Sequence, residues 1–443
     1  MVLKNGMSKW AARLRQSSFA RSLGILTSAS LLQTLITFGS APIVARLFTP
    51  EHFGIAGLIV ALSVVPILLF TGQYYSAIGI ARTRAEAVNL VTLSALLTIA
   101  GAILVLPISL YLGGHAALLP TSLQPVAPYL WTIAAFMLAT NLVGISRLWE
   151  IRHASYGPQV TNRVIEAGGI ALSQIGLGLL GTGAPGLIIG RWLGIAAAGL
   201  HGLKLMLARI GRPGLRTITR RRLGALSRRH WQFPAYQLPG AVLNGFIPQL
   251  TPLLLGLLYT IEAVGFFWFA SRLLERPAIV LGNNVGRVYF QHAADRRKKG
   301  QPVFGVFWRS TAVLAAFGVV PFGLVIAYGP MLFAWVFGTQ WEVAGHFAQW
   351  IAAAYFVFLI SFPARNATAL FALQKAFAVT ETCRAIASAG AVILVARAGG
   401  DALTAVAVGA LAQGLISLAF VAFVSVRLYR LDRDAGRAVQ PAS

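Results

Sequence analysis

Several arginine side chains lie inside one apolar stretch of the sequence, near residues 263–289. At about 100° per residue, the polar side chains of this stretch share about 100° of arc on one face of a helix. They are Trp268, Arg272, Arg276, Asn283 and Arg287, with Glu275 near the edge. A guanidinium group is planar and stays protonated, so it can hold two oxygens of a phosphate or carboxylate group at once. The pattern therefore predicts a face that recognises an anion.

The opposite face of this stretch is apolar and holds Leu274, Leu281, Val285 and Val288. Pro277 follows Arg276 directly, and a proline inside a helix removes a backbone hydrogen bond and usually bends the axis. We therefore expect a hinge at this position. An alternative remains open for part of the stripe, because Arg272 and Glu275 have the three-residue spacing of a local ion pair.

The elements that must position these arginines are strongly apolar. Of the 443 residues, 57% are hydrophobic and 11% are charged, whereas soluble domains have about 25% charged residues. Apolar runs of about 20 residues recur along the chain, and each can cross a hydrocarbon core about 30 Å thick as a helix. The pattern predicts an all-α polytopic membrane protein with about twelve transmembrane helices. The seventh, eighth and tenth spans are expected near residues 233–258, 263–289 and 345–370.

Other polar residues of the predicted spans are weaker candidates for the same site. Charged side chains within a membrane span are costly and usually face a cavity or a partner. Arg365 in the tenth span could receive an anionic headgroup, and Arg191 in the sixth span could take part in its release. Gln33 and Tyr74 could bind sugar hydroxyl groups, although such Tyr residues more often belong to the interfacial aromatic belt.

Acidic residues in the predicted spans are fewer than the arginines. Besides Arg272 and Glu275, two more pairs have a three-residue spacing, which favours local ion pairs. These pairs are Arg163 with Glu166 and Glu381 with Arg384. The predicted membrane interior is therefore cationic on balance.

The formal net charge of +25 is distributed unevenly along the chain. Lys and Arg residues outside the predicted spans lie almost entirely in the amino-terminal tail and in every second connection, including the stretch 209–231. The opposite connections hold only Arg46 and Arg397. The positive-inside rule then predicts that both termini are cytoplasmic. Because topology and anionic headgroups account for these charges, membrane lipids are expected partners and nucleic acid is not.

A short motif occurs twice in the sequence. Thr49, Glu51 and Gly54 recur as Thr260, Glu262 and Gly265. Both copies are predicted on the outer face, six spans apart, and an even number of spans preserves orientation. Chance recurrence of a glycine beside a polar turn is the alternative. The motif predicts two six-helix lobes related by a parallel repeat. The predicted domains are a basic cytoplasmic tail at 1–22, lobes at 23–208 and 233–428, a basic linker at 209–232 and a cytoplasmic tail at 429–443.

Three further segments read LLQTLITFGSAPIVARLFTPEHFG at 31–54, NNVGRVYFQHAA at 283–294 and VFGTQWEVAG at 336–345. They resemble the matching segments of bacterial polysaccharide flippases of the Wzx type, in the superfamily of multidrug, oligosaccharidyl-lipid and polysaccharide exporters. The resemblance implies passage of an undecaprenyl-diphosphate-linked oligosaccharide across the bacterial cytoplasmic (inner) membrane by alternating access. The cargo would serve synthesis of O-antigen, capsule or exopolysaccharide, with a polysaccharide polymerase and chain-length machinery as partners.

Two other classes of function remain to be weighed. A multidrug exporter, or an exporter of another lipid, could share the architecture, but cationic drugs and coupling cations call for carboxylates where this sequence has arginines. A polysaccharide polymerase or ligase needs a catalytic constellation on a sizeable outer loop, and the predicted outer loops are short. No metal spacing or catalytic motif is present, and Cys383 is the only cysteine. We expect a flippase that is not an enzyme and has no cofactor, catalytic residue or metal site.

Overall fold

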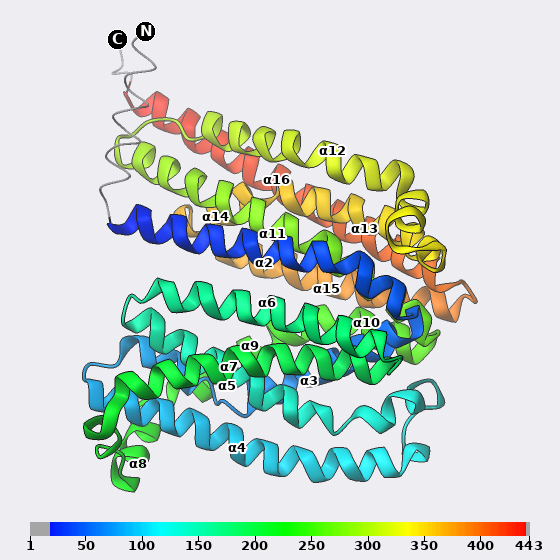
Figure 1. The fold of residues 1–443 in the computed structure, drawn as a ribbon. Coiled ribbons are helices and arrows are strands. Elements are labelled where there is room, and N and C mark those ends of the chain that lie inside the picture. The colour runs from blue at the N-terminus through cyan, green and yellow to red at the C-terminus, as the bar shows by residue number, and fades with distance from the viewer. Residues whose placement is uncertain (1–17, 440–443) are drawn as a thin grey trace. The chain divides into compact units, whose positions relative to one another are not determined.

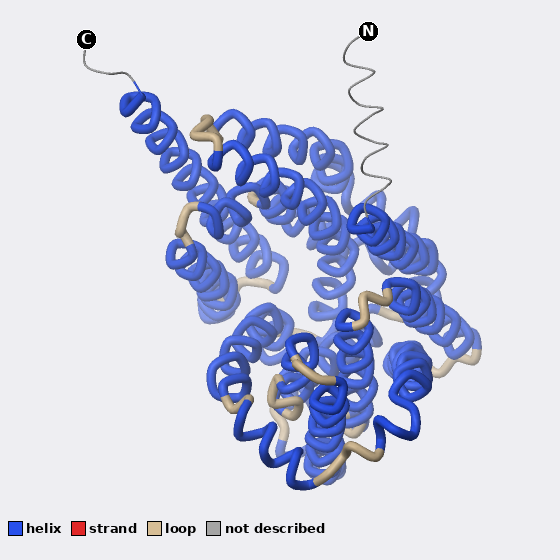
Figure 2. Tube along the Cα trace, turned by 90° about the vertical axis from the view of Figure 1, so that its left-hand side faces the viewer, coloured by secondary structure: helices blue, strands red, loops and turns tan. Residues whose placement is uncertain are grey.

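The computed structural model describes residues 18–439, and their regular secondary structure is helical throughout (Figure 2). Within this range, 10 helices are long and apolar enough to cross a membrane by length and composition. Two further predicted spans correspond to α6 and α11, helices of 24 and 38 residues that also carry charged side chains. The prediction of an all-α polytopic membrane protein is confirmed. Most of the predicted tail at 1–22, and the end of that at 429–443, lie outside the described residues.

The chain forms two compact units, one ending at Gln249 and the other beginning at Leu250. In the first unit, α6 packs along α2 and α7, and α5 packs along α4 and α7. Its helices, labelled in Figure 1, are α2 (Ser18–Leu47), α3 (Pro50–Leu69), α4 (Arg84–Gly114), α5 (Thr132–Arg152), α6 (Tyr156–Leu179), α7 (Ala184–Leu215), α8 (Arg220–Arg229) and α9 (Leu238–Phe246). Short 3-10 helices Tyr74–Ile80, Ala116–Leu118 and Thr121–Tyr129 connect them.

The second unit is built around the long helix α11. This helix packs on α13 and α14, while α12 pairs with α13 and α15 pairs with α16. The helices are α10 (Leu250–Leu258), α11 (Ile261–Lys298), α12 (Phe304–Phe337), α13 (Glu342–Ile360), α14 (Phe362–Leu370), α15 (Gln374–Arg397) and α16 (Ala402–Val439). The structure divides the chain at residues 249 and 250. The boundaries of the lobes and the linker stay predictions.

The repeated motif starts a helix in each unit. Thr49 is the N-cap of α3, and its side-chain oxygen accepts a hydrogen bond from the His52 amide at 3.4 Å. Thr260 is the N-cap of α11, and its side-chain oxygen accepts from the Ala263 amide at 3.2 Å. A hydroxyl at this position satisfies one of the amides that a helix start leaves without a partner. The glutamate of each copy then lies in the first turn, where the helix dipole favours negative charge.

Two predicted spans are interrupted rather than continuous. In the stretch 233–258, a π-helix (Phe233–Gln237) precedes α9, and a 3-10 turn (Ile247–Gln249) separates α9 from α10. The tenth predicted span breaks at Ser361, where Pro363 occupies the first turn of α14. Proline cannot donate a backbone hydrogen bond and clashes with the preceding turn, which accounts for helix ends at these sites. In contrast, α11 continues through Pro277 as one helix.

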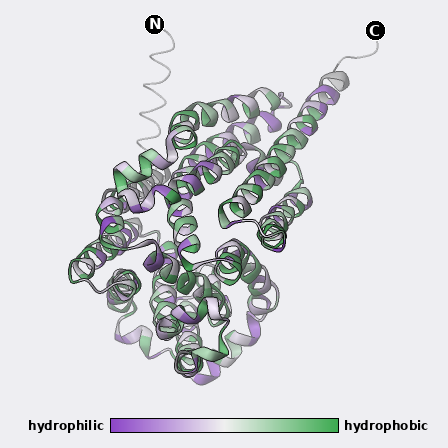
Figure 3. Cartoon of the chain, turned by 90° about the vertical axis from the view of Figure 1, so that its right-hand side faces the viewer, coloured by the Kyte–Doolittle hydropathy of each residue, from purple (hydrophilic) through white to green (hydrophobic). Residues whose placement is uncertain are grey.

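Many large apolar residues are exposed on the helices, and the hydropathy colouring in Figure 3 shows apolar residues along most of them. Leu35 is 68% exposed, Ile103 69% and Leu172 75%. A water-soluble protein rarely leaves such extended apolar surface uncovered. These side chains are therefore placed where lipid tails can cover them.

Candidate functional site

The orientation of α11 in the second unit is set by small residues. Ala278, Gly282 and Gly286 are buried at four-residue intervals on one side of the helix. A Cβ atom built at Gly282 would lie 2.2 Å from the Phe362 ring, and one at Gly286 would lie 2.5 Å from the Asn366 amide. Small side chains let two helices approach closely in a membrane. The face of α11 that meets α14 is therefore the small-residue face.

The predicted polar stripe of α11 lies to one side of this packed face. Trp268, Arg272 and Glu275 are half-buried, and the Arg272 guanidinium lies 5.4 Å from the centre of the Trp268 ring. Toward the other end of the helix, Arg276, Asn283 and Arg287 are exposed, and these three form no hydrogen bond or ion pair within residues 18–439. Two guanidinium groups of the stripe are thus available to an anion.

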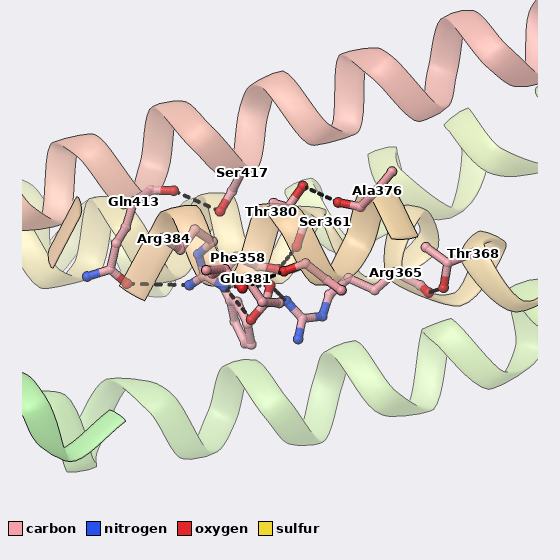
Figure 4. A network of polar contacts seen from close by, with 12 residues as sticks. Phe358, Ser361, Arg365, Thr368, Ala376, Thr380, Glu381, Arg384, Gln413 and Ser417 are labelled. Atoms are coloured by element: carbon pink, nitrogen blue, oxygen red, sulfur yellow. Dashed lines mark hydrogen bonds and ion pairs between the residues drawn. The ribbon is translucent and has the colours of Figure 1, made fainter. Parts of the chain in front are cut away.

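Arg365 lies in a polar network that joins three helices of the same unit (Figure 4). Its guanidinium on α14 forms an ion pair of 2.8 Å with the carboxylate of Glu381 on α15. Arg384, also on α15, donates to both oxygens of that carboxylate at 3.0 and 3.2 Å. Arg384 also reaches the Gln413 side-chain oxygen on α16 at 3.5 Å. The predicted local pair of Glu381 and Arg384 is confirmed, and Arg365 shares its carboxylate.

Aromatic rings surround the two guanidinium groups of this network. The Arg365 group lies 4.8 Å from the centre of the Phe358 ring, 4.9 Å from Phe377 and 5.8 Å from Phe362. The Arg384 group lies 5.2 Å from the Phe358 ring centre. Cations are attracted to ring faces, and a surrounding of rings also excludes water, which strengthens each charge interaction. The rings therefore hold both guanidinium groups in one place.

The network carries an excess of positive charge. One carboxylate, Glu381, balances two guanidinium groups, so a formal charge of about +1 is left over. The Nε atom of Arg384 is buried and has no hydrogen-bond partner among the described residues. A buried donor without a partner is unfavourable. The cluster is therefore suited chemically to accept a second anionic oxygen group.

The remaining predicted site residues belong to the first unit. Arg191 is half-buried on α7, and Gln33 is half-buried on α2. The hydroxyl of Tyr74 donates to the backbone oxygen of Ser227 at 3.2 Å. Tyr74 thus has a structural contact with α8, and its proposed contact with sugar stays a prediction.

Sequence reasoning missed the connection between Arg365 and Glu381. The two residues lie on different helices and are 16 positions apart, so no helical spacing links them. A usable signal was nonetheless present: charges within membrane spans usually pair with one another. Glu381 is the acidic residue next along the chain after Arg365, across a short connection. Gln413 carried no comparable signal.

A comparison with known protein families assigns this chain to one of them. Residues 43–346 match the family model described as polysaccharide biosynthesis protein. Because this match covers well over half of the chain, the protein belongs to the polysaccharide biosynthesis protein family, and the resemblance found in the sequence is confirmed at that level. No curated protein sequence matches the chain.

Solved structures of transporters share the fold. The lipid II flippase MurJ in an inward closed conformation has a TM-score of 0.68 at 13% identity, covering 93% of this chain and 90% of that one. An inward-facing multidrug resistance transporter of the MATE family and MOP superfamily has a TM-score of 0.64 at 14% identity, with coverage of 90% and 96%. A MOP superfamily transporter from Pyrococcus furiosus, described as having a binding pocket of reverse polarity, has a TM-score of 0.51 at 13% identity, with 93% of each chain covered. These comparisons show that the chain shares the all-helical membrane fold of these transporters.

Proposed function

We propose that this protein is a flippase that moves undecaprenyl-diphosphate-linked oligosaccharide repeat units across the bacterial cytoplasmic membrane for surface polysaccharide synthesis. The observation that carries the proposal is the cationic interior of the second unit. There, Arg365 and Arg384 share a single carboxylate, and Arg276 and Arg287 form no ion pair within the described residues. A diphosphate is anionic at neutral pH, and guanidinium groups match its oxygen geometry.

A multidrug exporter would place different chemistry at these positions. Cationic drugs need carboxylates that remain available, whereas the carboxylate of Glu381 is held by two guanidinium groups. The site therefore favours an anionic headgroup as cargo. Family membership in polysaccharide biosynthesis supports the same choice.

The first test removes the gene and follows the lipid-linked intermediates. Loss of the protein should leave oligosaccharide repeat units on undecaprenyl diphosphate at the cytoplasmic face, where extraction and sizing detect them. Surface polymer should fall in parallel and return with a plasmid copy. Normal surface polymer in a deletion strain that has no second flippase would contradict the proposal.

A second test concerns Arg276, which is exposed beside the half-buried Glu275. If Arg276 holds the diphosphate, Arg276→Lys keeps the charge but loses the two-point geometry, and Arg276→Ala loses both. Complementation of the deletion strain should fall in that order at equal membrane abundance. If Arg276 only balanced Glu275, the double variant Glu275→Gln/Arg276→Gln would recover activity, because neither charge is left alone. Full activity of the double variant would remove Arg276 from the cargo site.

The proposed orientation, with both termini cytoplasmic, is tested by labelling cysteines in intact cells after the exposed native thiol is removed by Cys383→Ser. Gly114 and Gly224 suit this purpose because an added Cβ meets nothing within 4 Å at either position. Thr339 is exposed and avoids Gly338, whose φ of 109° disfavours any other residue. An impermeant reagent should label Gly114→Cys and Thr339→Cys but not Gly224→Cys. The reverse pattern would overturn the orientation.

A further inference from the structure

The short helix α8 of the first unit follows α7 and precedes the candidate span Phe233–Leu258. It packs beside the beginning of α4 at one end of that unit (Figure 1). Leu226 is the buried residue of the helix and belongs to a core cluster with Ala87, Met206 and Ile210. One side of α8 is therefore fixed against the protein, at the level where the neighbouring spans end.

Polar contacts hold the same side of α8 in place. The Glu86 carboxylate lies 3.2 Å from Nε2 of His230 and 3.6 Å from the Arg229 guanidinium. That carboxylate is buried and also accepts from the Arg82 amide at 2.9 Å. Arg222 donates to the Thr217 backbone oxygen at 3.0 Å. Two of the five arginines of α8 are thus used in anchoring the helix.

The other three arginines form the outward face of α8. At about 100° per residue, Arg220, Arg221 and Arg228 fall within about 100° of arc centred near Gly224, opposite Leu226. All three arginines are exposed, and none forms a hydrogen bond or ion pair in the part of the chain that the structure describes. This outward face is therefore a surface of three guanidinium groups on a rigid support.

No nearby acid in the sequence neutralises this outward face. The segment between Glu166 and Glu262 contains no Asp or Glu, and Glu86, which contacts α8, is already held by its own partners. Just beyond the helix, Trp231 is 51% exposed and Tyr236 is 72% exposed, with their ring centres 5.5 Å apart. Trp and Tyr side chains of this kind are typical of the membrane interface, where one part of the ring is apolar and the other is hydrated.

We propose that the outward face of α8 binds the headgroups of anionic phospholipids in the adjacent leaflet. The neighbouring spans place α8 at headgroup level, and the charge of the face is complementary to phosphatidylglycerol and similar lipids. The exposed aromatic pair supplies the interfacial contact that a soluble acidic protein or RNA would not require. Because this surface and the cationic cluster of the second unit have no residue in common, the proposal does not depend on the nature of the cargo.

Electrostatic attraction gives an expected size for the effect. Each Lys or Arg near an anionic leaflet strengthens binding about fivefold. Replacing all three arginines of the outward face by glutamine should therefore weaken lipid binding on the order of a hundredfold. Added salt should weaken it further, because the exposed charges are screened.

The test uses the full-length protein in nanodiscs, with a bimane fluorophore on Gly224→Cys in the Cys383→Ser background. Phosphatidylglycerol carrying a nitroxide near its headgroup is compared with phosphatidylcholine carrying the same nitroxide. We expect stronger quenching by the anionic lipid, and loss of this preference in Arg220→Gln/Arg221→Gln/Arg228→Gln. The three arginines have no hydrogen-bond or ion-pair partner among residues 18–439, so the variant should keep the elution profile and thermal midpoint of the parent.

A charge-matched control removes three basic residues at the end of α11 instead. These are Arg296, Arg297 and Lys298. Their replacement by glutamine should leave the lipid preference at Gly224→Cys unchanged. Equal quenching by the two lipids in the parent protein would overturn the proposal, as would an equal loss of preference in the control variant. Neither result would bear on whether the protein transports oligosaccharide.

Discussion

Replacing Glu381 by glutamine removes the carboxylate that Arg365 and Arg384 share. The amide is nearly the same size, so the change is in charge rather than in packing. In the protein, the carboxylate lies 2.8 Å from one guanidinium and 3.0 Å from the other. Without this carboxylate, the two guanidinium groups lie among phenylalanine side chains with no anion between them.

The size of the effect follows from how far the network is buried. Breaking a buried ion pair by removing one partner costs about 3–5 kcal/mol, whereas an exposed pair contributes about 0–1 kcal/mol. The side chains of Arg365, Arg384 and Glu381 are 23%, 14% and 36% exposed, between these limits. Glu381→Gln should therefore lower the free energy of unfolding by about 2 kcal/mol. Arg365→Gln leaves a one-to-one pair of Arg384 and Glu381, and should cost about 1 kcal/mol or less.

The assay compares thermal-unfolding midpoints of the purified variants in detergent, followed by the loss of monodisperse protein on size exclusion. Glu381→Gln should unfold at a lower temperature than Arg365→Gln, and both should unfold below the parent. The order of the two variants is the diagnostic result. A midpoint for Glu381→Gln at or above that of Arg365→Gln would refute the reasoning that this carboxylate balances two guanidinium groups.

The same variant has an opposite effect on binding if the cluster receives the cargo. A diphosphate must compete with Glu381 for the two guanidinium groups, so removal of the carboxylate should strengthen binding. We expect about tenfold tighter binding of a diphosphate probe such as farnesyl diphosphate, since 1.4 kcal/mol corresponds to a factor of ten. Arg365→Gln/Arg384→Gln should weaken it. Unchanged affinity in folded Glu381→Gln would leave Arg276 and Arg287 as the remaining candidates in this unit.

Three further changes test the fold around the site. Gly282→Ala places a methyl group 2.2 Å from a neighbouring ring and should destabilise the protein by about 1–3 kcal/mol, whereas Gly323→Ala, which meets nothing within 4 Å, should leave the thermal midpoint unchanged or higher. Thr260→Ala removes the cap of α11 and should lower the free energy of unfolding by about 1 kcal/mol, measured in the same unfolding assay. Hydrogen bonds from Thr404 lower the pKa of the Asp401 carboxyl, so its contribution to stability is present above its ordinary pKa of about 3.9 and is lost as the pH falls through the lower folded value. Amide exchange at the start of α16 should accelerate in acid for the parent, and Asp401→Asn should lack that pH dependence.

The helices could be predicted from the sequence because apolarity summed over about 20 residues is a strong signal. The starts of α3 and α11 were also marked in the sequence, because Thr49 and Thr260 are of a residue type that commonly caps helices. The breaks were harder to predict. Pro277 lies inside a continuous helix, whereas Pro363 begins a new one. Tertiary packing decides whether the carbonyl that a proline leaves without a donor finds another partner. The pattern of residues along the sequence carries no information about that packing.

The face that α11 packs against its neighbours was also not predictable from apolarity. Leu274 and Val288 were predicted on the same apolar side, yet Leu274 is 8% exposed and Val288 is 52% exposed. In a membrane, a side chain that faces lipid is as apolar as one that faces protein, so hydrophobic periodicity does not distinguish them. The small residues Gly282 and Gly286 mark the close contact instead. Residue size is the better signal for helix contacts in such a chain.

The second unit contains arginines in two different electrostatic states, and transport needs both strong recognition and release. Arg276 and Arg287 are exposed and form no hydrogen bond or ion pair within the described residues, so an arriving phosphate displaces no bound carboxylate there. Arg365 and Arg384 hold Glu381, so a phosphate must displace a carboxylate and can be displaced by it in turn. A site built only from uncompensated cations would release a diphosphate slowly, because differences in affinity act mostly on the dissociation rate. A resident carboxylate limits that affinity, which is why Glu381→Gln should bind the diphosphate more tightly and yet transport it more slowly.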